Sequence, residues 1–336
     1  MTHLLESLNT SKLVLKNRLI MPPLATEKCG EEGKPSKALL DYYDEKSRGG
    51  YISLIIIEHS FISQQGKASE RQLSVADDST IEGLRKVADI IHKNGCKAVM
   101  QLNHAGSGTT REVTGSILVA PSAVENPFMK SGIPRELTYD EIQGIVKSFK
   151  DAAVRVKAAG FDGVEIHSAH GYLLNQFYSP LTNKRTDEYG GDDVKDRIKI
   201  HLQVIKAVRE AVGDEFPIFM RLGASDYMEG GTTLEDSKAA VCEFEKAGLD
   251  VLDISGGFCR FTVPGNNSQG YFSELSGSLK QFVSIPVILT GGITKAEVAE
   301  ELLADVKADL IGVGRAMYKD SSWAKRAVES FEHSKG

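Results

Sequence analysis

Short apolar runs alternate with amphipathic segments along the whole sequence, and this alternation constrains the fold more than any other feature. The apolar runs are rich in β-branched residues, which is typical of strands buried on both faces. They are RLIMPPL (18–24), YISLIIIEH (51–59), KAVMQL (97–102), GVEIH (163–167), PIFMRL (217–222), DVLDIS (250–255), IPVILT (285–290) and ADLIGVG (308–314). Strands that alternate with helices must run parallel and be joined by right-handed crossovers.

The segments between these runs have helical periodicity and end in glycine. They cover 81–95, 141–160, 194–213 and 234–248, and they close with Gly95, Gly160, Gly213 and Gly248. A glycine directly after a helix supplies the left-handed residue that ends it. The count of about eight such strands predicts a closed (β/α)8 TIM barrel of the α/β class rather than an open doubly wound sheet.

Nothing between the runs resembles a linker, so we expect one domain over residues 1–336. The length and the 41% hydrophobic content are sufficient for a core of that size. Two stretches exceed usual loop lengths: 103–137, rich in Gly, Ser, Thr and Pro, and 257–272. Long excursions inside a compact domain are usually functional, so we expect 103–137 to form part of a cap over the site.

Charge and cysteine content exclude several classes of function. The formal net charge is -6, which gives no basic field for nucleic acid or for an anionic membrane. The first residues lack the pattern of a secretory signal, and no apolar run is long enough to span a bilayer. The four cysteines have no metal-ligand spacing. We therefore expect a cytoplasmic protein without a metal site, a nucleic-acid partner or a membrane partner.

The end of the 163–167 run gathers three polar rings, His167, His170 and Tyr172. Barrel active sites form at the carboxyl ends of the strands, which is where these residues lie. Alternation along a strand places Glu165 and His167 on one face, and the polar face is expected to point into the barrel. Such groups are expensive to bury without partners, so the pattern predicts a polar network or a ligand here.

Two further signals lie at other strand ends. Gln101 and Arg221 can point inward, either to form a core ion pair, for example Arg221 with Glu165, or to bind the polar edge of a planar ring. Glycines follow the last two strands in LTGGI and GVGRAMY, which is the usual position of a barrel phosphate cup. The candidate phosphate ligands are Gly291, Gly292, Gly314 and Arg315.

Three other functions compete with a ring-binding site. His167 and His170 could hold a metal with His59 or His104 as a third ligand, as in a metal-dependent hydrolase. The glycine-rich cup could serve a sugar-phosphate isomerase or aldolase, although the late strands carry no inward lysine for an aldolase. A barrel without activity that only binds a partner is the third alternative.

The sequence resembles the old yellow enzymes, the FMN-dependent ene-reductases and NADH:flavin oxidoreductases of the (β/α)8 class. The similarity runs from LKNRLIMPPLAT to GVGRAMYKD and is most specific in HxxHGYLLxQFxSPxxNxRTDxYGG, which begins at His167. QLNHAG, FMRLGASDY and IGVGR support it. In that motif, NxRTDxYGG (183–191) is expected to be a structural loop.

The resemblance implies FMN as cofactor and NADH or NADPH as reductant. It implies that Pro23, Leu24 and Ala25 line the flavin, that Gln101 and Arg221 contact its pyrimidine side, and that Gly291, Gly292, Gly314 and Arg315 take its phosphate. His167 and His170 would bind a carbonyl oxygen of the substrate, and Tyr172 would donate a proton. The implied reaction is ping-pong reduction of the C=C bond of α,β-unsaturated carbonyl compounds; the alternative is an NADH oxidase or flavin reductase. A quinone or oxygen could also accept the electrons, and a homo-oligomer is possible.

The sequence departs from the family at three positions. Ala25 stands where Thr or Cys is usual, Glu27 where some relatives have an aromatic residue, and His59 where a small residue is common. Ala25 offers no hydrogen bond to the flavin, so the potential should be lower unless Thr26 substitutes. The chain also ends soon after its last helix, so we expect electrons to come directly from NAD(P)H.

Overall fold

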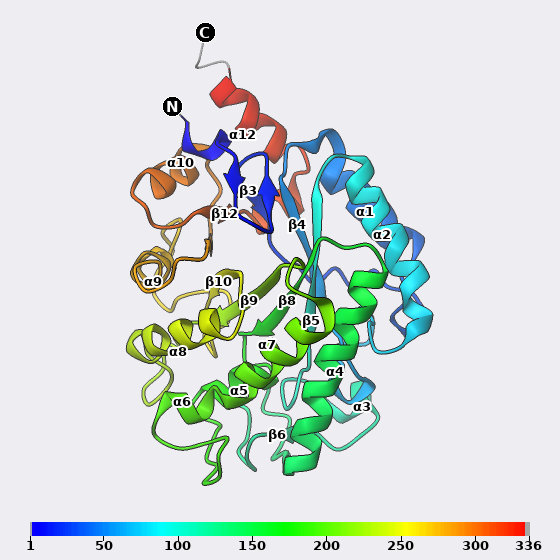
Figure 1. Cartoon of the computed structure of the whole chain (residues 1–336), viewed down its shortest axis with the longest axis vertical. Coiled ribbons are helices and arrows are strands. Elements are labelled where there is room, and N and C mark those ends of the chain that lie inside the picture. Colours follow the sequence, from blue (N-terminus) through cyan, green and yellow to red (C-terminus); the bar gives the residue numbers. More distant parts are fainter. Residues whose placement is uncertain (1, 333–336) are drawn as a thin grey trace.

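Eight parallel strands close into a barrel in the computed structural model, which describes residues 2–332 (Figure 1). Around the barrel the order is β10-β11-β12-β3-β4-β5-β8-β9. The strands are β3 (Leu19–Met21), β4 (Leu54–Phe61), β5 (Lys97–Asn103), β8 (Gly163–Ser168), β9 (Ile218–Gly223), β10 (Val251–Ser255), β11 (Val287–Thr290) and β12 (Leu310–Gly312). Each lies within or overlaps one of the predicted runs, so the TIM-barrel prediction is confirmed.

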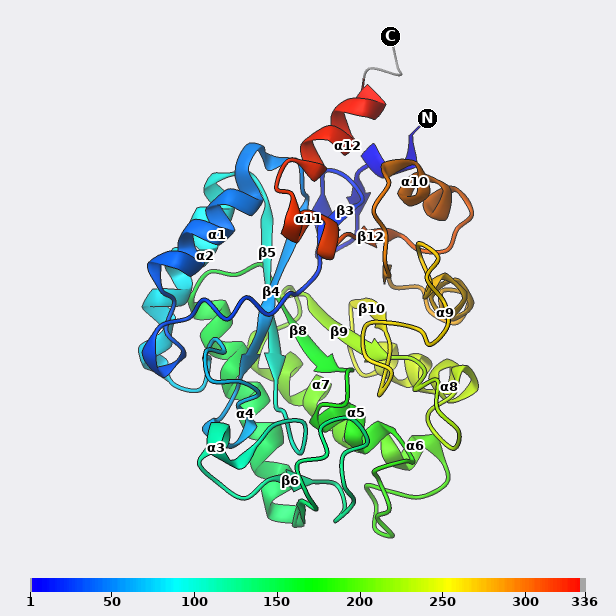
Figure 2. The same ribbon diagram turned by 180° about the vertical axis from the view of Figure 1, so that it is seen from behind.

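Helices cover the outside of the barrel, and the view from behind shows the same arrangement (Figure 2). The longer helices are α1 (Lys37–Ser47), α2 (Ile81–Lys93), α4 (Tyr139–Ala158), α7 (Lys199–Val212), α8 (Leu234–Lys246), α9 (Ser273–Leu279), α10 (Ala296–Ala304) and α12 (Trp323–Glu332). The short ones are α3 (Arg111–Thr114), α5 (Leu173–Tyr178), α6 (Val194–Arg197) and α11 (Arg315–Lys319). Single 3-10 turns are η1 (His3–Leu5), η2 (Glu31–Gly33), η3 (Arg48–Gly50), η4 (Gln64–Gly66) and η5 (Asp78–Thr80).

The predicted helix ends agree with the structure. Gly95, Gly160, Gly213 and Gly248 all have positive φ, between 79° and 108°. The helix expected over 194–213 is interrupted at Ile198, so that α6 and α7 replace it. Capping boxes start α4 at Thr138 and α8 at Thr233, where each threonine accepts a hydrogen bond from the backbone N–H three residues later.

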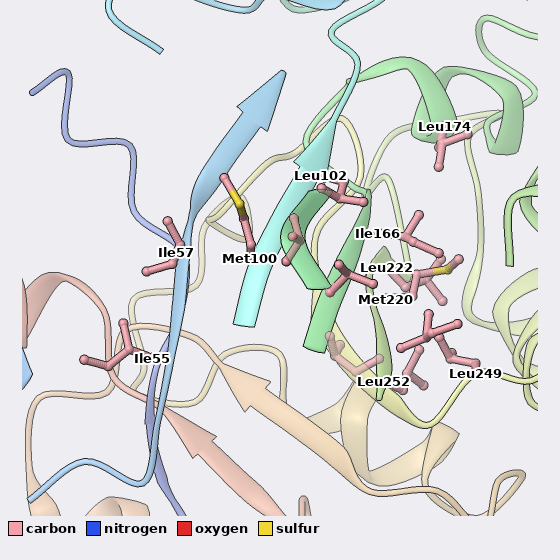
Figure 3. Close-up of a cluster of buried hydrophobic side chains, with 14 of the residues drawn as sticks. Ile55, Ile57, Met100, Leu102, Ile166, Leu174, Met220, Leu222, Leu249 and Leu252 are labelled. Carbon is pink, nitrogen blue, oxygen red and sulfur yellow. The ribbon is translucent and has the colours of Figure 1, made fainter. Parts of the chain in front are cut away.

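The alternation of side chains separates two apolar cores. Inside the barrel, each of seven strands contributes at least one residue to a cluster that also contains Leu13 and Leu15. Its strand members are Ile20, Leu54, Ile56, Val99, Phe219, Val251, Ile288 and Leu310. Leu15 belongs to the hairpin β1 (Leu8–Asn9) and β2 (Val14–Leu15), which packs against this cluster. The neighbouring strand residues face the helices in a second, larger core, part of which Figure 3 shows.

A bulge near the end of β4 changes the direction of its side chains. The pairing of β4 with β5 shifts register between Ile57 and Ser60. Ile55 and Ile57 lie in the outer core, and the next residue, Glu58, also points outward and contacts Tyr43 of α1. His59 therefore points to the inside of the barrel, which an unbroken alternation would not allow.

The excursion at 103–137 is ordered and carries α3 and a two-stranded parallel sheet of β6 (Val119–Ala120) and β7 (Arg135–Glu136). The NxRTDxYGG loop holds it in place, because Arg185 Nη1 donates to the carbonyls of Pro121 at 2.8 Å and Leu137 at 2.7 Å. The loop is structural, as predicted. Within residues 2–332, no helix combines the length and the apolar character needed to cross a membrane.

Candidate active site

A cavity of about 910 Å³ opens at the carboxyl end of the barrel, and each of the eight strands, or the loop that follows it, contributes to its lining. One lining residue from each strand end or following loop is Pro22, His59, Gln101, His167, Arg221, Ser255, Thr290 and Gly314. Eleven predicted site residues meet in this cavity: Pro23, Leu24, Ala25, Gln101, His167, His170, Tyr172, Arg221, Gly292, Gly314 and Arg315. Gly291 does not line it; its carbonyl accepts a hydrogen bond from the backbone of Gly270 at 2.6 Å.

His167, His170 and Tyr172 form one cluster of rings, as the sequence predicted. The ring centroid of His167 lies 5.0 Å from that of His170 and 5.3 Å from that of Tyr172. Burial lowers the pKa of both imidazoles well below the ordinary value, helped by nearby positive groups, and it raises the pKa of the Tyr172 phenol. At neutral pH all three groups are uncharged and able to donate a hydrogen bond.

The backbone around His170 is arranged to present its ring. His170 has φ 62°, in the left-handed region that a non-glycine residue rarely adopts. Its N–H donates to the carbonyl of Gly256 at 3.2 Å, and its Nε2 is 2.7 Å from the Ser255 hydroxyl. Two contacts with the end of β10 thus hold a strained residue in position, as is common at functional sites.

His59 completes the cluster from β4. Its ring centroid is 5.4 Å from that of Tyr172, and the amide of Gln72 donates to its Nδ1 at 2.6 Å. The amide orientation follows from its oxygen, which accepts the N–H of Ala68 at 2.6 Å. Since Nδ1 accepts, the proton is on Nε2. Burial lowers the pKa of His59 to about 4, so this ring is also neutral at pH 7.

Below these rings lies a group of buried polar side chains on four neighbouring strands, β5, β8, β9 and β10. Gln101 Nε2 donates to Glu165 Oε2 at 2.7 Å, and Arg221 Nη1 is 3.5 Å from Asp253 Oδ2. Arg221 therefore pairs with Asp253 rather than with Glu165. Its strand β9 lies between β8 and β10, but Arg221 is in register with Asp253 of β10, whereas Glu165 of β8 is in register with Phe219. Burial raises the pKa of Asp253 to about 6 and that of Glu165 well above its ordinary value.

Arg221 retains free hydrogen-bonding capacity. Its Nε and Nη1 are buried and have no hydrogen-bond partner among residues 2–332. Buried guanidinium donors are normally satisfied, so their state points to a missing acceptor in the cavity. At the other end, Gly292, Gly314, Arg315 and Lys319 surround the part of the cavity that follows β11 and β12. A Cβ on Gly314 would lie 3.3 Å from the Pro22 ring, so glycine at this position lets that ring pack close to the backbone of residue 314.

The three positions at which the sequence departs from the family, Ala25, Glu27 and His59, do not all lie in the cavity. Ala25 and His59 line the cavity, whereas Glu27 accepts a hydrogen bond from Ser69 at 2.6 Å and does not line it. The Thr26 side chain is buried beside Glu58, to which it is hydrogen-bonded, and it also does not line the cavity. Thr26 is therefore not placed to substitute for the hydrogen bond that Ala25 lacks.

The metal alternative has little support from the geometry. In residues 2–332 no three His, Cys, Asp or Glu side chains are grouped so that they could hold a metal ion. His104, one suggested third ligand, accepts the N–H of Gly106 at its Nδ1 and is not part of the cavity lining.

Sequence reasoning missed Arg260, which lines the cavity on the loop after β10. The segment 257–272 was predicted to be functional from its length, but no motif singled out this arginine. Its backbone is left-handed, with φ 61°, and its guanidinium carbon lies 4.1 Å from the ring centroid of Phe128 in the excursion at 103–137. Only the fold brings these two loops together.

Comparison with known proteins gives one consistent result. The profile of the NADH:flavin oxidoreductase / NADH oxidase family matches residues 3–333. An NADH oxidase of Thermoanaerobacter brockii is 42% identical over 94% of this chain and 49% of the relative, so the chain spans about half the length of that protein. An NADPH dehydrogenase of Geobacillus thermodenitrificans is 36% identical over 98% of this chain and 94% of the relative.

Solved structures agree with these sequences. An old yellow enzyme homologue from Zymomonas mobilis superimposes with a TM-score of 0.85 at 26% identity, covering 97% of this chain and 92% of the other. Morphinone reductase in complex with tetrahydroNAD gives a TM-score of 0.83 at 29% identity, covering 97% of this chain and 90% of the other.

Proposed function

The chain belongs to the NADH:flavin oxidoreductase / NADH oxidase family, and from this premise we propose that it is an FMN-dependent oxidoreductase that reduces the C=C bond of α,β-unsaturated carbonyl compounds with NAD(P)H. The observation that carries the proposal is the meeting of His167, His170 and Tyr172 in the same cavity as Arg221 and Arg315. The names of the relatives, NADH oxidase and NADPH dehydrogenase, support the reductant.

The residues of the cavity fit FMN. Arg221 has buried N–H groups that make no hydrogen bond to a described residue, which suits the polar edge of an isoalloxazine, and Gln101 lines the same cavity. Pro23, Leu24 and Ala25 offer a mostly apolar surface, and Gly292, Gly314 and Arg315 are suited to a phosphate. Bound FMN would supply the chemistry of accepting a hydride from NAD(P)H and delivering it to the substrate.

The chain's own residues would polarise and protonate the substrate. As hydride reaches the β-carbon, negative charge grows on the carbonyl oxygen, and the N–H groups of His167 and His170 can stabilise it. Because burial keeps both imidazoles neutral, they donate without losing a proton to the substrate. Tyr172 holds its proton until the α-carbon takes it, which completes addition of hydrogen across the C=C bond.

The test is to follow each half-reaction separately. We expect the purified protein to contain FMN, to be reduced by NADH or NADPH, and to be reoxidised faster by enones than by oxygen. Stopped-flow absorbance of the flavin measures the rates of its reduction by NADH or NADPH, its reoxidation by an enone and its reoxidation by oxygen. The proposal is contradicted if the protein binds no flavin, or if no enone reoxidises its reduced form.

A second candidate is an NADH oxidase or flavin reductase, and Ala25 is the observation that favours it. The Ala25 side chain has no donor, and the Thr26 side chain is bonded to Glu58 outside the cavity, so neither side chain can donate a hydrogen bond to a flavin there. Loss of a donor destabilises the reduced flavin, which promotes transfer of electrons to oxygen. Reoxidation by oxygen that outruns every enone would favour this candidate.

A further inference from the structure

The cavity has an unbalanced charge. Its lining includes Arg221, Arg260, Arg315 and Lys319 but no aspartate or glutamate, although the whole chain has a formal net charge of -6. Arg221 has Asp253 nearby, and the proposed FMN would account for Arg315 and Lys319 through its phosphate. One cation, Arg260, is left without an anion.

Arg260 is held in place by aromatic rings instead of by carboxylates. Its guanidinium carbon lies 4.1 Å from the centroid of Phe128 and 5.5 Å from that of Phe261. Among the described residues no carboxylate forms an ion pair with this side chain, and its Nε is buried without a hydrogen-bond partner. Stacking on aromatic faces fixes the plane of a guanidinium and leaves its N–H edge available for a bidentate acceptor.

The cation is close to the reacting groups. The Phe261 ring that contacts Arg260 is also 6.2 Å from the ring centroid of His170. The charge of Arg260 contributes to lowering the pKa of His59, His167 and His170, and it opposes the rise that burial causes in the pKa of Tyr172. Arg260 and the histidines are therefore close enough for one small molecule to place an anionic group at Arg260 and a carbonyl oxygen at the histidines.

The buried carboxylate of Asp226 fixes the loop that carries Arg260. Asp226 Oδ1 accepts the N–H of Phe258 at 2.8 Å, and its Oδ2 accepts the N–H of Thr232 at 2.7 Å. Any Cβ on Gly257 would lie 2.0 Å from Asp226 Oδ1. Arg260 is thus presented by a fixed loop rather than by a free chain end.

We propose that the substrate carries a carboxylate, which Arg260 binds while His167 and His170 hold the carbonyl oxygen of the enone. This inference rests on the proposed function, whose substrate class it narrows. A carboxylate matches the paired N–H groups of a guanidinium. Because the Phe261 ring contacts both Arg260 and His170, the anion is expected on the substrate itself rather than on a phosphate group far from the reacting carbonyl.

The test compares acids with their methyl esters. The probes are 4-oxocyclohex-2-ene-1-carboxylate and (4-oxocyclohex-2-en-1-yl)acetate, whose charge is separated from the enone by saturated carbon. Enzymes are the wild type, Arg260→Gln, Arg260→Lys and the control Lys130→Gln, which removes an exposed cation of the cap that does not line the cavity. The ratio of kcat/KM for acid over ester is measured for each enzyme, together with its FMN content.

We expect Arg260→Gln to lower the acid-to-ester ratio by about 10- to 100-fold, the value of a charge-assisted hydrogen-bonded pair. The rate with the ester should change less than about threefold, Arg260→Lys should fall between, and Lys130→Gln should match the wild type. An unchanged ratio in Arg260→Gln overturns the proposal. So does a variant that slows only flavin reduction by NADH or NADPH, because Arg260 would then serve the reductant.

A binding measurement separates this inference from the proposed function. Calorimetric titration with the saturated 4-oxocyclohexane-1-carboxylate and its methyl ester needs no turnover. The acid should bind the wild type more tightly than the ester by about tenfold or more, and Arg260→Gln should lose that preference. If the reduced enzyme is reoxidised by no enone, neither these acids and esters nor the uncharged enones of the earlier test, the proposed function fails, and this titration alone then decides the role of Arg260.

Discussion

At the scale of single residues, burial shifts the pKa of the imidazoles and of the phenol in the cavity in opposite directions, and both shifts keep the groups neutral. It lowers the pKa of His167 and His170 and raises that of Tyr172. The imidazoles therefore stabilise charge through hydrogen bonds, and the phenol keeps its proton for the substrate. The two roles separate in the two half-reactions, since only reduction of the alkene requires a proton at carbon.

Replacement of Tyr172 by phenylalanine should slow alkene reduction by about 10²-fold or more, the usual contribution of a general acid. Flavin reduction by NAD(P)H needs no proton from Tyr172 and should remain within about threefold of the wild type. Stopped-flow traces of both half-reactions give the comparison. Equal loss in both would show that the residue positions ligands rather than protonating them.

Ala25 should set a low flavin potential. Ala25→Thr would add a hydroxyl donor at the cavity wall, and one neutral hydrogen bond to the reduced flavin is worth about 0.5–1.5 kcal/mol, or about 10–30 mV for two electrons. The potential is measured by dye-coupled equilibration. Thr26→Val is the matched control, because the Thr26 side chain is bonded to Glu58 outside the cavity, and it should leave the potential unchanged. A larger shift in Thr26→Val than in Ala25→Thr would reverse our placement of these two residues.

At the scale of elements, the turn after β10 positions two site residues at once. Gly256 O accepts the N–H of His170 at 3.2 Å, and the same turn leads to Arg260. A Cβ on Gly256 would lie 2.2 Å from the carbonyl oxygen of Arg260, so the turn cannot keep its path with any larger residue.

Gly256→Ala should therefore lower the rate of alkene reduction by about tenfold or more, because misplacement of a site by about 1 Å is costly. FMN content should stay near that of the wild type, since the proposed phosphate ligands follow other strands. Gly144→Ala is the control: its Cβ would meet nothing within 4 Å in α4, and alanine favours a helix. Wild-type rates in Gly256→Ala would show that the turn does not position the site.

The elements of the fold were largely predictable, whereas several parts of the site were not. Strands and helix ends follow from local periodicity and glycine, and the strand ends correctly located the cavity. The bulge in β4 that turns His59 inward depends on pairing with β5, and the contact of Arg260 with Phe128 joins two distant loops. The pairing of Arg221 with Asp253 required the strand register. Such features depend on tertiary contacts that a local pattern does not encode.

At the scale of the whole molecule, the closed barrel lets every strand deliver a residue to one cavity while it buries many polar groups nearby. His201 of α7 is one of them: it is fully buried, its Nε2 is 2.8 Å from the Ser168 hydroxyl of β8, and its ring stacks on Phe244 at 5.6 Å. Burial lowers its pKa to about 3, against an ordinary value of about 6.5. The folded protein thus holds it neutral where the unfolded chain would bind a proton.

This difference makes the fold sensitive to acid, with a sign that follows from proton binding. Between about pH 6.5 and pH 3 the unfolded chain binds more protons at His201, so its contribution to stability is present above this window and is lost as pH falls through it. The free energy of unfolding of the wild type relative to His201→Gln should shrink by about 1.4 kcal/mol per pH unit there. Urea unfolding of FMN-saturated proteins measures it. His92→Gln is the opposite control, because the hydrogen bond to Asp162 raises the pKa of His92, and its contribution is present at low pH and lost as pH rises. If both variants shift in the same direction, burial of neutral histidine does not account for the acid sensitivity.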